Sequence, residues 1–336
     1  MSFCVMPDIL DFLFIFGLQS EPRDLGFSSF REQVSLKQSF SKCSISSLGR
    51  SGRQYQICYN LKGVTEKMVD LENPAMNEYS IRPAAFYHRF DVVGGNALWI
   101  VTKGGLDIQD RFKELTGKDA RPEDKSFGDT QECFRSSLSA HLMFCHWSTE
   151  DWRGYIKWLE YYGHFPSLFY CELTCGTETK MAVLAPTSNG YHFTVYTAAD
   201  IQRFLGWQEK ISEAIAMLES NIEVMKSLVR FYTKLEENRD FDLRLSCTDD
   251  IEEFCNQLCN MVNDFTLQIS RARALVKLTG DRGELIKQHR LERLNQNMER
   301  EAIMVRIVTI VTLIYLPATF VSGHCNFQVG CIEPGG

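Results

Sequence analysis

The sequence lacks the features that direct a chain to secretion. No Lys or Arg occurs before Arg23, and Asp8 and Asp11 interrupt the short apolar run at residues 9–16. A secretory signal needs a basic start and an unbroken apolar centre, so this N-terminus does not fit one. The 12 cysteines are scattered along the chain. We therefore expect reduced thiols that face the cytosol.

Two further absences limit the function. The chain has 36 Lys and Arg against 43 Asp and Glu and no basic block. This balance argues against nucleic acid as a partner, because phosphate neutralisation needs clustered positive charge. The dinucleotide-binding Gly motif, the phosphate-binding P-loop and the zinc-protease motif are all missing from the sequence. We therefore expect no enzymatic activity.

The spacings of cysteine and histidine residues do not match those of a soft-metal site. His141, Cys145 and His146 form the pattern H-x-x-x-C-H, but no two further ligands stand nearby at matching spacing. A core cysteine and a partly buried histidine are the favoured interpretation. Cys255 and Cys259 belong to an apolar helical stripe and are read as small apolar residues.

A long apolar run stands near the C-terminus. Residues 302–322 number 21 and are interrupted only by Arg306. At 1.5 Å per residue they cover about 31 Å, against a hydrocarbon thickness of roughly 30 Å. We expect a transmembrane helix with Arg306 near one interface. The alternative is a core helix of a soluble protein.

Charge beside this run predicts its orientation. From Arg271 to Arg306 there are 9 Lys and Arg and 5 Asp and Glu, whereas the 14 residues after Ser322 carry only Glu333. Basic residues favour the cytoplasmic side of a membrane. The N-terminal part is therefore expected to be cytoplasmic, in a membrane that the sequence does not specify.

The N-terminal part mixes strand and helix patterns. β-branched and aromatic residues predict strands at 54–61, 85–93 and 97–102, and Gly94-Gly95-Asn96 predicts a hairpin between the last two. Apolar residues at steps of three and four predict two helices within 130–162. A short buried helix or strand is expected at 9–16, and irregular structure in the Ser-rich segment 27–52.

Two long apolar stripes follow, each with coiled-coil steps of four and three. The first comprises Ile211, Ile215, Leu218, Ile222, Met225, Val229 and Tyr232. The second comprises Ile251, Cys255, Leu258, Val262, Phe265, Ile269, Ala272 and Val276. Asp249 and Glu252 have the form of a capping box at the start of the second helix.

These patterns predict an α+β protein. We expect an α/β cytosolic domain at 1–199, a long helical hairpin or stalk at 200–301, a transmembrane helix at 302–322 and a short tail at 323–336.

The apolar run also carries a resemblance. Residues 306–323, RIVTIVTLIYLPATFVSG, resemble the first transmembrane helix of the CorA family of magnesium transporters, in which a basic residue opens the helix and a Pro-x-Thr-Phe segment precedes the family signature. The specific part of the likeness is Leu316–Phe320. It extends over nearly all of residues 8–322. The upstream segments, which resemble the cytosolic portion of a fungal branch of CorA-like proteins, are 49–64, 99–119 and 126–160.

The tail departs from this family. There the signature Gly-Met-Asn and a second transmembrane helix follow the first, whereas residues 323–336 read GHCNFQVGCIEPGG. Asn326 is expected to be the remnant of the signature's Asn. The Gly, Cys and Pro content of the tail leads us to expect a C-terminally truncated gene model that ran into an intron.

The resemblance implies a homo-oligomer, a pentamer in the family, around a pore in the lipid bilayer. Alignment of Pro317 with the family's proline places Val305, Val308, Leu316 and Thr319 at pore-facing positions. The three apolar residues would form constrictions and Thr319 a ring of hydroxyls, which suits weak binding of hydrated Mg²⁺. Pro317 is expected to kink the helix. The alternative is that these residues face only lipid or neighbouring helices.

The resemblance also implies a use for the acidic residues between Glu209 and Glu253, which would hold regulatory Mg²⁺. A solvated acidic face is the alternative, and no metal ligand is assigned. No cofactor is expected beyond Mg²⁺ as the transported or regulatory ion.

Three functions remain open at this point. The first is a CorA-like membrane protein that transports a divalent cation, which we expect to be Mg²⁺. In this truncated form it could be inactive. The second is a non-conducting, tail-anchored interaction protein whose coiled-coil helices bind partners. The third is a soluble helical protein whose apolar run is buried at an interface.

Overall fold

The computed structural model describes most of the chain. The described residues are 5–16, 26–45, 47, 49–67, 78–103, 107–118, 127–164 and 198–328. The chain divides into two compact units, one of Met1–Thr179 with Phe204–Leu278 and the other of Lys180–Arg203 with Thr279–Gly336.

The first unit is built on a four-stranded antiparallel sheet of strand order β1-β2-β3-β4. The strands are β1 (Phe30–Ser35), β2 (Gln54–Lys67), β3 (Glu78–Asp91) and β4 (Ala97–Lys103). The three predicted strands are confirmed, and β2 and β3 are both longer than expected.

The prediction of irregular structure at 27–52 is wrong in part. This segment contains β1 and the 3-10 helix η1 (Gln38–Cys43). Strand β1 pairs with β2 from Phe30 opposite Tyr59 to Ser35 opposite Gln54. Its middle four residues are exposed, so it has no alternating apolar pattern. Pairing with β2, and not its own sequence, makes this segment a strand.

The predicted hairpin joins β3 and β4. Gly95 has a φ of +68°, a conformation that glycine adopts without strain. The carboxylate of Asp91 accepts hydrogen bonds from the backbone N–H of Val93 and Gly94. Local hydrogen bonding of this kind explains why the turn could be predicted from its residues.

The helices are α1 (Ile9–Phe14), α2 (Asp107–Thr116), α3 (Thr130–Thr149), α4 (Trp152–His164), α6 (Ala198–Glu237) and α7 (Thr248–Gln328). The prediction of two helices within 130–162 is confirmed, and 9–16 contains a helix. The predicted capping box is wrong, since α7 begins at Thr248 and Asp249 lies in its first turn. Helix α7 passes through Gly280 and Gly283 as one α-helix.

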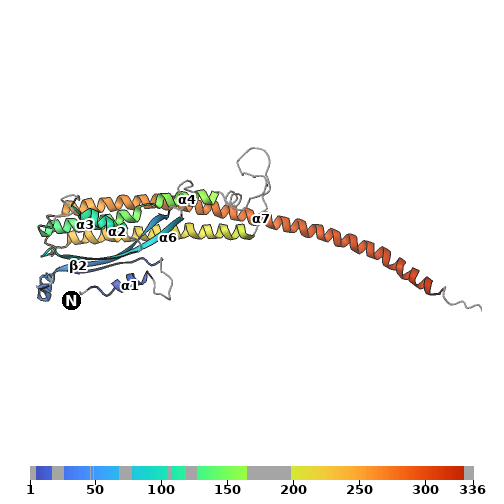
Figure 1. Cartoon of the computed structure of the whole chain (residues 1–336), viewed down its shortest axis with the longest axis horizontal. Coiled ribbons are helices and arrows are strands. Elements are labelled where there is room, and N and C mark those ends of the chain that lie inside the picture. Colours follow the sequence, from blue (N-terminus) through green and yellow to red (C-terminus); the bar gives the residue numbers. More distant parts are fainter. Residues whose placement is uncertain are drawn as a thin grey trace, which may run out of the picture. The chain divides into compact units, whose positions relative to one another are not determined.

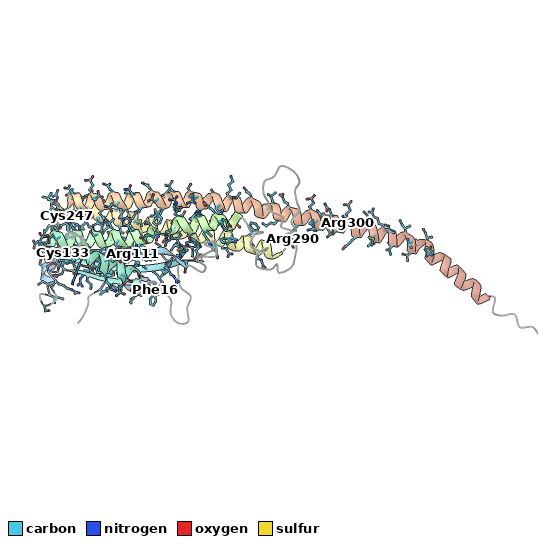
Figure 2. All side chains as sticks on the ribbon, turned by 45° about the horizontal axis from the view of Figure 1, so that its top comes forward. Phe16, Arg111, Cys133, Cys247, Arg290 and Arg300 are labelled. Carbon is cyan, nitrogen blue, oxygen red and sulfur yellow. The ribbon has the colours of Figure 1, made fainter. Side chains whose placement is uncertain are left out.

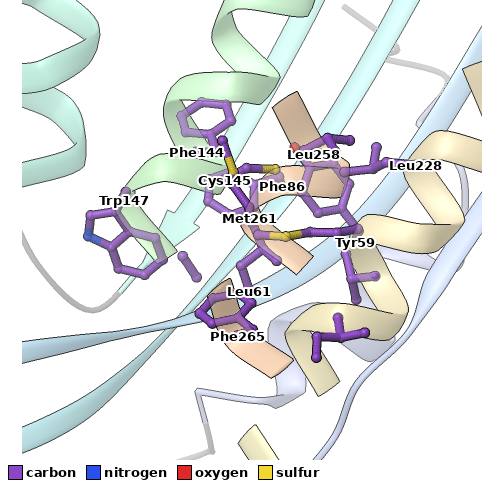
Figure 3. Close-up of a cluster of buried hydrophobic side chains, with 14 of the residues drawn as sticks. Tyr59, Leu61, Phe86, Phe144, Cys145, Trp147, Leu228, Leu258, Met261 and Phe265 are labelled. Atoms are coloured by element: carbon purple, nitrogen blue, oxygen red, sulfur yellow. The ribbon is translucent and has the colours of Figure 1, made fainter. Parts of the chain in front are cut away.

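The two faces of the sheet are covered differently (Figure 1). Helix α1 covers one face, where Phe12 packs with Cys58 and Tyr87 in a small cluster. The other face packs against α3, α4, α6 and α7 in one large core. Figure 3 shows part of this core, with Tyr59 from β2, Phe144 from α3 and Leu228 from α6 close together.

Helices α6 and α7 pack antiparallel in this unit. The rings of Tyr232 and Phe254 lie 5.0 Å apart, and further along both helices Arg273 pairs with Glu219 at 2.6 Å. The two predicted apolar stripes are buried or half-buried. The buried face is wider than those stripes, because both helices also cover the sheet; Leu228 and Met261 belong to it.

Candidate functional site

The predicted membrane segment is the C-terminal part of α7. Its backbone is helical throughout 302–322. Every described side chain from Arg290 to Tyr315 is exposed, including Val305 at 64% and Val308 at 62%. Apolar side chains are thus presented on all sides of this helix, a pattern that suits an apolar environment better than water.

Two hydroxyl groups in this segment, those of Thr309 and Thr312, are satisfied by the helix itself. The Thr309 Oγ1 donates to the backbone carbonyl of Val305 at 2.7 Å, and the Thr312 Oγ1 donates to that of Val308. Such back-bonding needs no water. These two threonines therefore do not oppose burial of the segment in hydrocarbon.

Two predicted pore positions share one face of α7. Val305 and Val308 are three residues apart, and Thr312 continues the same face four residues later. The side chains of Leu316, Pro317, Thr319 and Asn326 lie outside the described part of the structure. The assignment of all these residues to a pore remains a prediction.

Two features are absent from the described residues. Among them, no helix has both the length and the apolarity needed to cross a bilayer. They also contain no group of three or more His, Cys, Asp or Glu side chains placed to hold a metal ion.

Several acidic residues of the segment 209–253 are engaged in ion pairs. Glu219 pairs with Arg273, Glu223 with Lys226 3.2 Å away, and Asp250 with Arg135 2.7 Å away. These carboxylates contact basic side chains of the same unit. Their ion pairs account for part of the acidic excess without a metal.

The H-x-x-x-C-H group is split between core and surface. His141 and Cys145 are fully buried, whereas His146 is exposed. The Nδ1 of His141 lies 2.6 Å from the Tyr59 hydroxyl, and its Nε2 lies 3.1 Å from Nδ1 of His88. The prediction of a core cysteine is confirmed, and His141 is part of a buried hydrogen-bonded chain.

His88 was not singled out from the sequence. It lies on β3, and its ring stacks on Trp99 of β4 at a centroid distance of 4.0 Å. Trp99 is the cross-strand partner of His88 in the register, so the pairing of the two strands brings them together. Alternation along 85–93 would have placed His88 on one face with Phe86 and Phe90. It would not have predicted the contact with His141.

Both imidazoles are neutral in the fold. Burial lowers the pKa of His88 to about 3, with a smaller effect from Arg89. Burial lowers the pKa of His141 far below its usual range, and His88 adds to this. Since imidazole is a strong acceptor, we take the Tyr59 hydroxyl as the donor to His141, whose Nε2–H then donates to His88. Proton uptake is therefore disfavoured at both His88 and His141.

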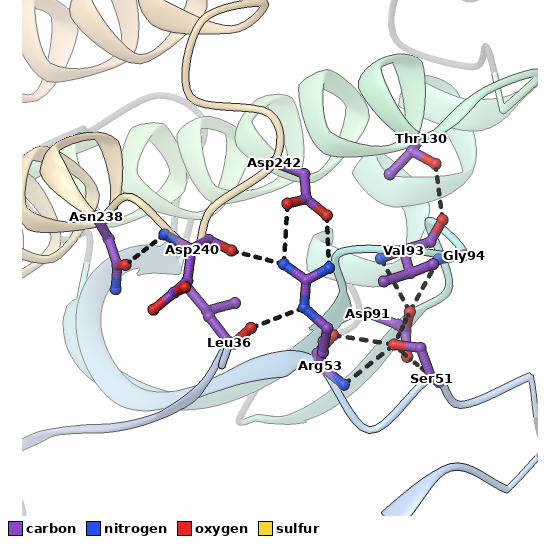
Figure 4. Close-up of polar contacts among 10 residues, drawn as sticks. All are labelled: Leu36, Ser51, Arg53, Asp91, Val93, Gly94, Thr130, Asn238, Asp240 and Asp242. Atoms are coloured by element: carbon purple, nitrogen blue, oxygen red, sulfur yellow. Dashed lines mark hydrogen bonds and ion pairs between the residues drawn. The ribbon is translucent and has the colours of Figure 1, made fainter. Parts of the chain in front are cut away.

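A second polar contact, partly buried, connects the residue directly before β2 with the turn between α6 and α7 (Figure 4). Arg53 pairs with Asp242 through two hydrogen bonds of 2.7 and 2.9 Å. It also donates to the backbone carbonyls of Leu36 and Asp240. Arg53 was not predicted, because its partners are distant in sequence. These hydrogen bonds hold the α6–α7 turn against the sheet, so the role of Arg53 is structural.

The six cysteines with described side chains are free thiols: Cys58, Cys133, Cys145, Cys247, Cys255 and Cys259. Burial raises the pKa of Cys58 and Cys145. Their thiols therefore stay protonated and unreactive.

Sequence comparison identifies the N-terminal part of the chain. The family model of CorA-like transporters matches residues 2–163, which include the sheet, α3 and the buried histidine chain. This part of the chain is similar to CorA-like transporters. No curated protein shows significant sequence similarity to the chain. The matched part ends within α4, and α6 and α7 follow it.

Proposed function

We propose that this chain is a subunit of a membrane-embedded homo-oligomer that transports divalent cations, with Mg²⁺ as the expected ion. The observation that carries the proposal is the CorA-like match of residues 2–163 in a chain whose α7 continues into the apolar segment 302–322. The basic residues that precede this segment would place the CorA-like domain in the cytoplasm.

The exposed apolar surface of α7 supports a membrane role for this segment. A helix with apolar side chains all round is stable when it is buried in protein or in lipid. The back-bonded Thr309 and Thr312 are compatible with either environment. In the proposed oligomer, Val305 and Val308 would line an apolar constriction of the pore, and Thr319 a ring of hydroxyls.

The test is Mg²⁺ uptake by cells that lack their own CorA-type transporters and express this chain. We expect uptake above that of empty-vector cells, and loss of at least roughly tenfold for Val308→Phe, because a larger side chain would close an apolar constriction. Ile310→Phe is the matched control. It adds the same side chain about 200° around the helix, where we expect contact with lipid and uptake within about twofold of the wild type.

Two results would contradict the proposal. If the chain is retained in membranes and no uptake occurs, the tethered interaction protein becomes the better interpretation. If the chain leaves the membrane fraction on carbonate extraction, a soluble protein with a buried α7 is favoured.

A further inference from the structure

Helix α7 carries an exposed apolar seam before the proposed membrane segment. Leu291, Leu294 and Met298 are 61%, 54% and 58% exposed and follow one another at steps of three and four. The same steps continue to Val305 and Val308. An apolar stripe at this spacing is the pattern by which helices pack on one another. The seam therefore indicates a helical partner.

Charged residues lie on the two flanks of the seam. In a heptad that begins at Leu291, Glu292 and Glu299 occupy position b on one flank, and Arg293 and Arg300 occupy position c on the other. All four side chains are exposed. Figure 2 shows Arg300 and Arg290 projecting from the helix, and Arg290, at position g, lies on the basic flank as well. Between residues 290 and 300 one flank is thus acidic and the other basic, and Arg306 follows at position b where the apolar run begins.

From Leu291 onward, the positions next to the seam carry no charge. They are occupied by Asn295, Asn297, Ala302 and Met304. In two-stranded coiled coils these e and g positions commonly carry the charges that pair the helices. A wide uncharged face with charges further out fits a helix that has a neighbour on each side. Glu301, at position d, is the polar exception within the seam.

A second copy of this chain fits both flanks. We propose that Glu292 and Glu299 of one copy contact Arg293 and Arg300 of the next, so that the α7 helices assemble side by side in a parallel ring. Glu299 and Arg300 differ by one residue, or about 1.5 Å along the axis, so they meet at the same level when the helices are parallel and in register, and both Glu–Arg contacts form together only in that register. Contacts between unlike flanks close into a ring when each copy is rotated by the same fraction of a turn about one axis, as parallel helices in one bilayer allow.

This inference rests on the proposed function, which places α7 of every copy in one bilayer with the same orientation. It adds which side chains join neighbouring copies and why the ring closes. Opposite charges on the two flanks also disfavour antiparallel pairs, because these bring like flanks together, and a parallel pair shifted by one heptad keeps only one of the two contacts.

Charge reversal on the full-length chain tests the pairing. The mass of the detergent-solubilised protein is measured by light scattering over a concentration series at low salt. We expect Glu292→Arg with Glu299→Arg to weaken self-association at least roughly tenfold, because both flanks become basic. Arg293→Glu with Arg300→Glu should do the same. The variant with all four changes restores complementary flanks and should return to within about threefold of the wild type.

The control reverses two exposed acids of α7 outside the seam, Glu252→Arg with Asp264→Arg, and should leave self-association unchanged. The effect of single-flank reversal should shrink in high salt, where exposed charges are screened.

The outcomes separate the two proposals. A monomeric wild type overturns the oligomer on which the proposed function depends. If the wild type is oligomeric but single-flank reversal leaves self-association unchanged, or the fourfold change does not restore it, only the charge pairing is overturned.

Discussion

Gly63 of β2 lies against the indole of Trp147 on α3. A Cβ at this position would lie 2.8 Å from Cζ2 of Trp147 and 3.0 Å from its Cε2. The indole is itself buried in the core, so it has little room to move. The absence of a side chain at residue 63 therefore sets how closely α3 approaches the sheet.

We expect Gly63→Ala to lower the free energy of unfolding by about 1–3 kcal/mol through overpacking, measured by urea unfolding. Gly206→Ala is the matched control. A Cβ at Gly206 meets nothing within 4 Å, so this change should raise helix stability by up to about 1 kcal/mol. If Trp147→Phe fails to relieve the effect of Gly63→Ala, the indole contact is not its cause.

The buried histidines make stability depend on pH. Because burial lowers the pKa of both His88 and His141, the unfolded chain binds protons at a higher pH than the fold does. Their contribution is therefore fully present above the unfolded pKa of about 6.5 and is lost as pH falls toward 3. Each histidine contributes a slope of up to roughly 1.4 kcal/mol per pH unit in that window.

Unfolding at pH 7, 6 and 5, followed by tryptophan fluorescence, measures this slope. His88→Leu should reduce it by close to one proton. His146→Gln, which changes an exposed histidine of the same helix as His141, should reduce it less. Equal effects of the two changes would contradict the assignment of the slope to the buried chain.

At the scale of elements, α6 takes the place of a missing strand beside β2. Strand β1 ends its pairing at Phe30 opposite Tyr59, and among the described residues no strand continues along that edge of β2. The side chain of Asn221 on α6 accepts from the N–H of Lys62 at 2.9 Å and donates to its carbonyl at 2.7 Å. Pro83 of β3 is the partner of Lys62 in the register, and a proline has no backbone N–H to donate. The backbone N–H and carbonyl of Lys62 bond to α6 instead.

We expect Asn221→Leu to destabilise the protein by about 2–5 kcal/mol, since it leaves a buried N–H and a buried carbonyl without partners. Chemical unfolding measures the change. Ser227→Ala on the same helix is the control, because its exposed hydroxyl donates to the carbonyl of Glu223, one turn earlier. A loss below about 1 kcal/mol would mean that water replaces Asn221.

At the scale of the whole molecule, the main question is the environment of the C-terminal part of α7. Ile314 lies in the apolar run with 65% of its side chain exposed. We expect Ile314→Asp to reduce the fraction of chain that survives carbonate extraction, because an Asp near the centre of a spanning helix costs about 2.5–3.5 kcal/mol. Leu267→Asp, at an equally exposed position of α7 outside the run, should leave that fraction unchanged. Equal retention of both variants would argue against a spanning segment.

Local patterns were sufficient for much of the fold. The apolar patterns of β2 to β4, the Gly94-Gly95 hairpin and the helical steps of α3, α4, α6 and α7 depend on neighbours close in sequence, and these elements were predicted. The apolar segment 302–322 was equally visible in the residues themselves, and the CorA-like resemblance seen there has its family match at residues 2–163. The start of α7 was misplaced because the carbonyl of Cys247 already accepts the N–H of Ile251, so the helix begins before Asp249.

Only the tertiary structure decided the contacts between residues far apart in sequence. Strand β1 exists because β2 pairs with it, and the chain from Tyr59 through His141 to His88 exists because α3 packs on the sheet. Arg53 finds Asp242 across 189 positions of sequence. The sequence by itself determined the elements and the apolar segment, since side-chain periodicity acts within one element. The buried polar partners were decided by the fold, because burial makes any hydrogen bond in the core depend on which distant group the packing supplies.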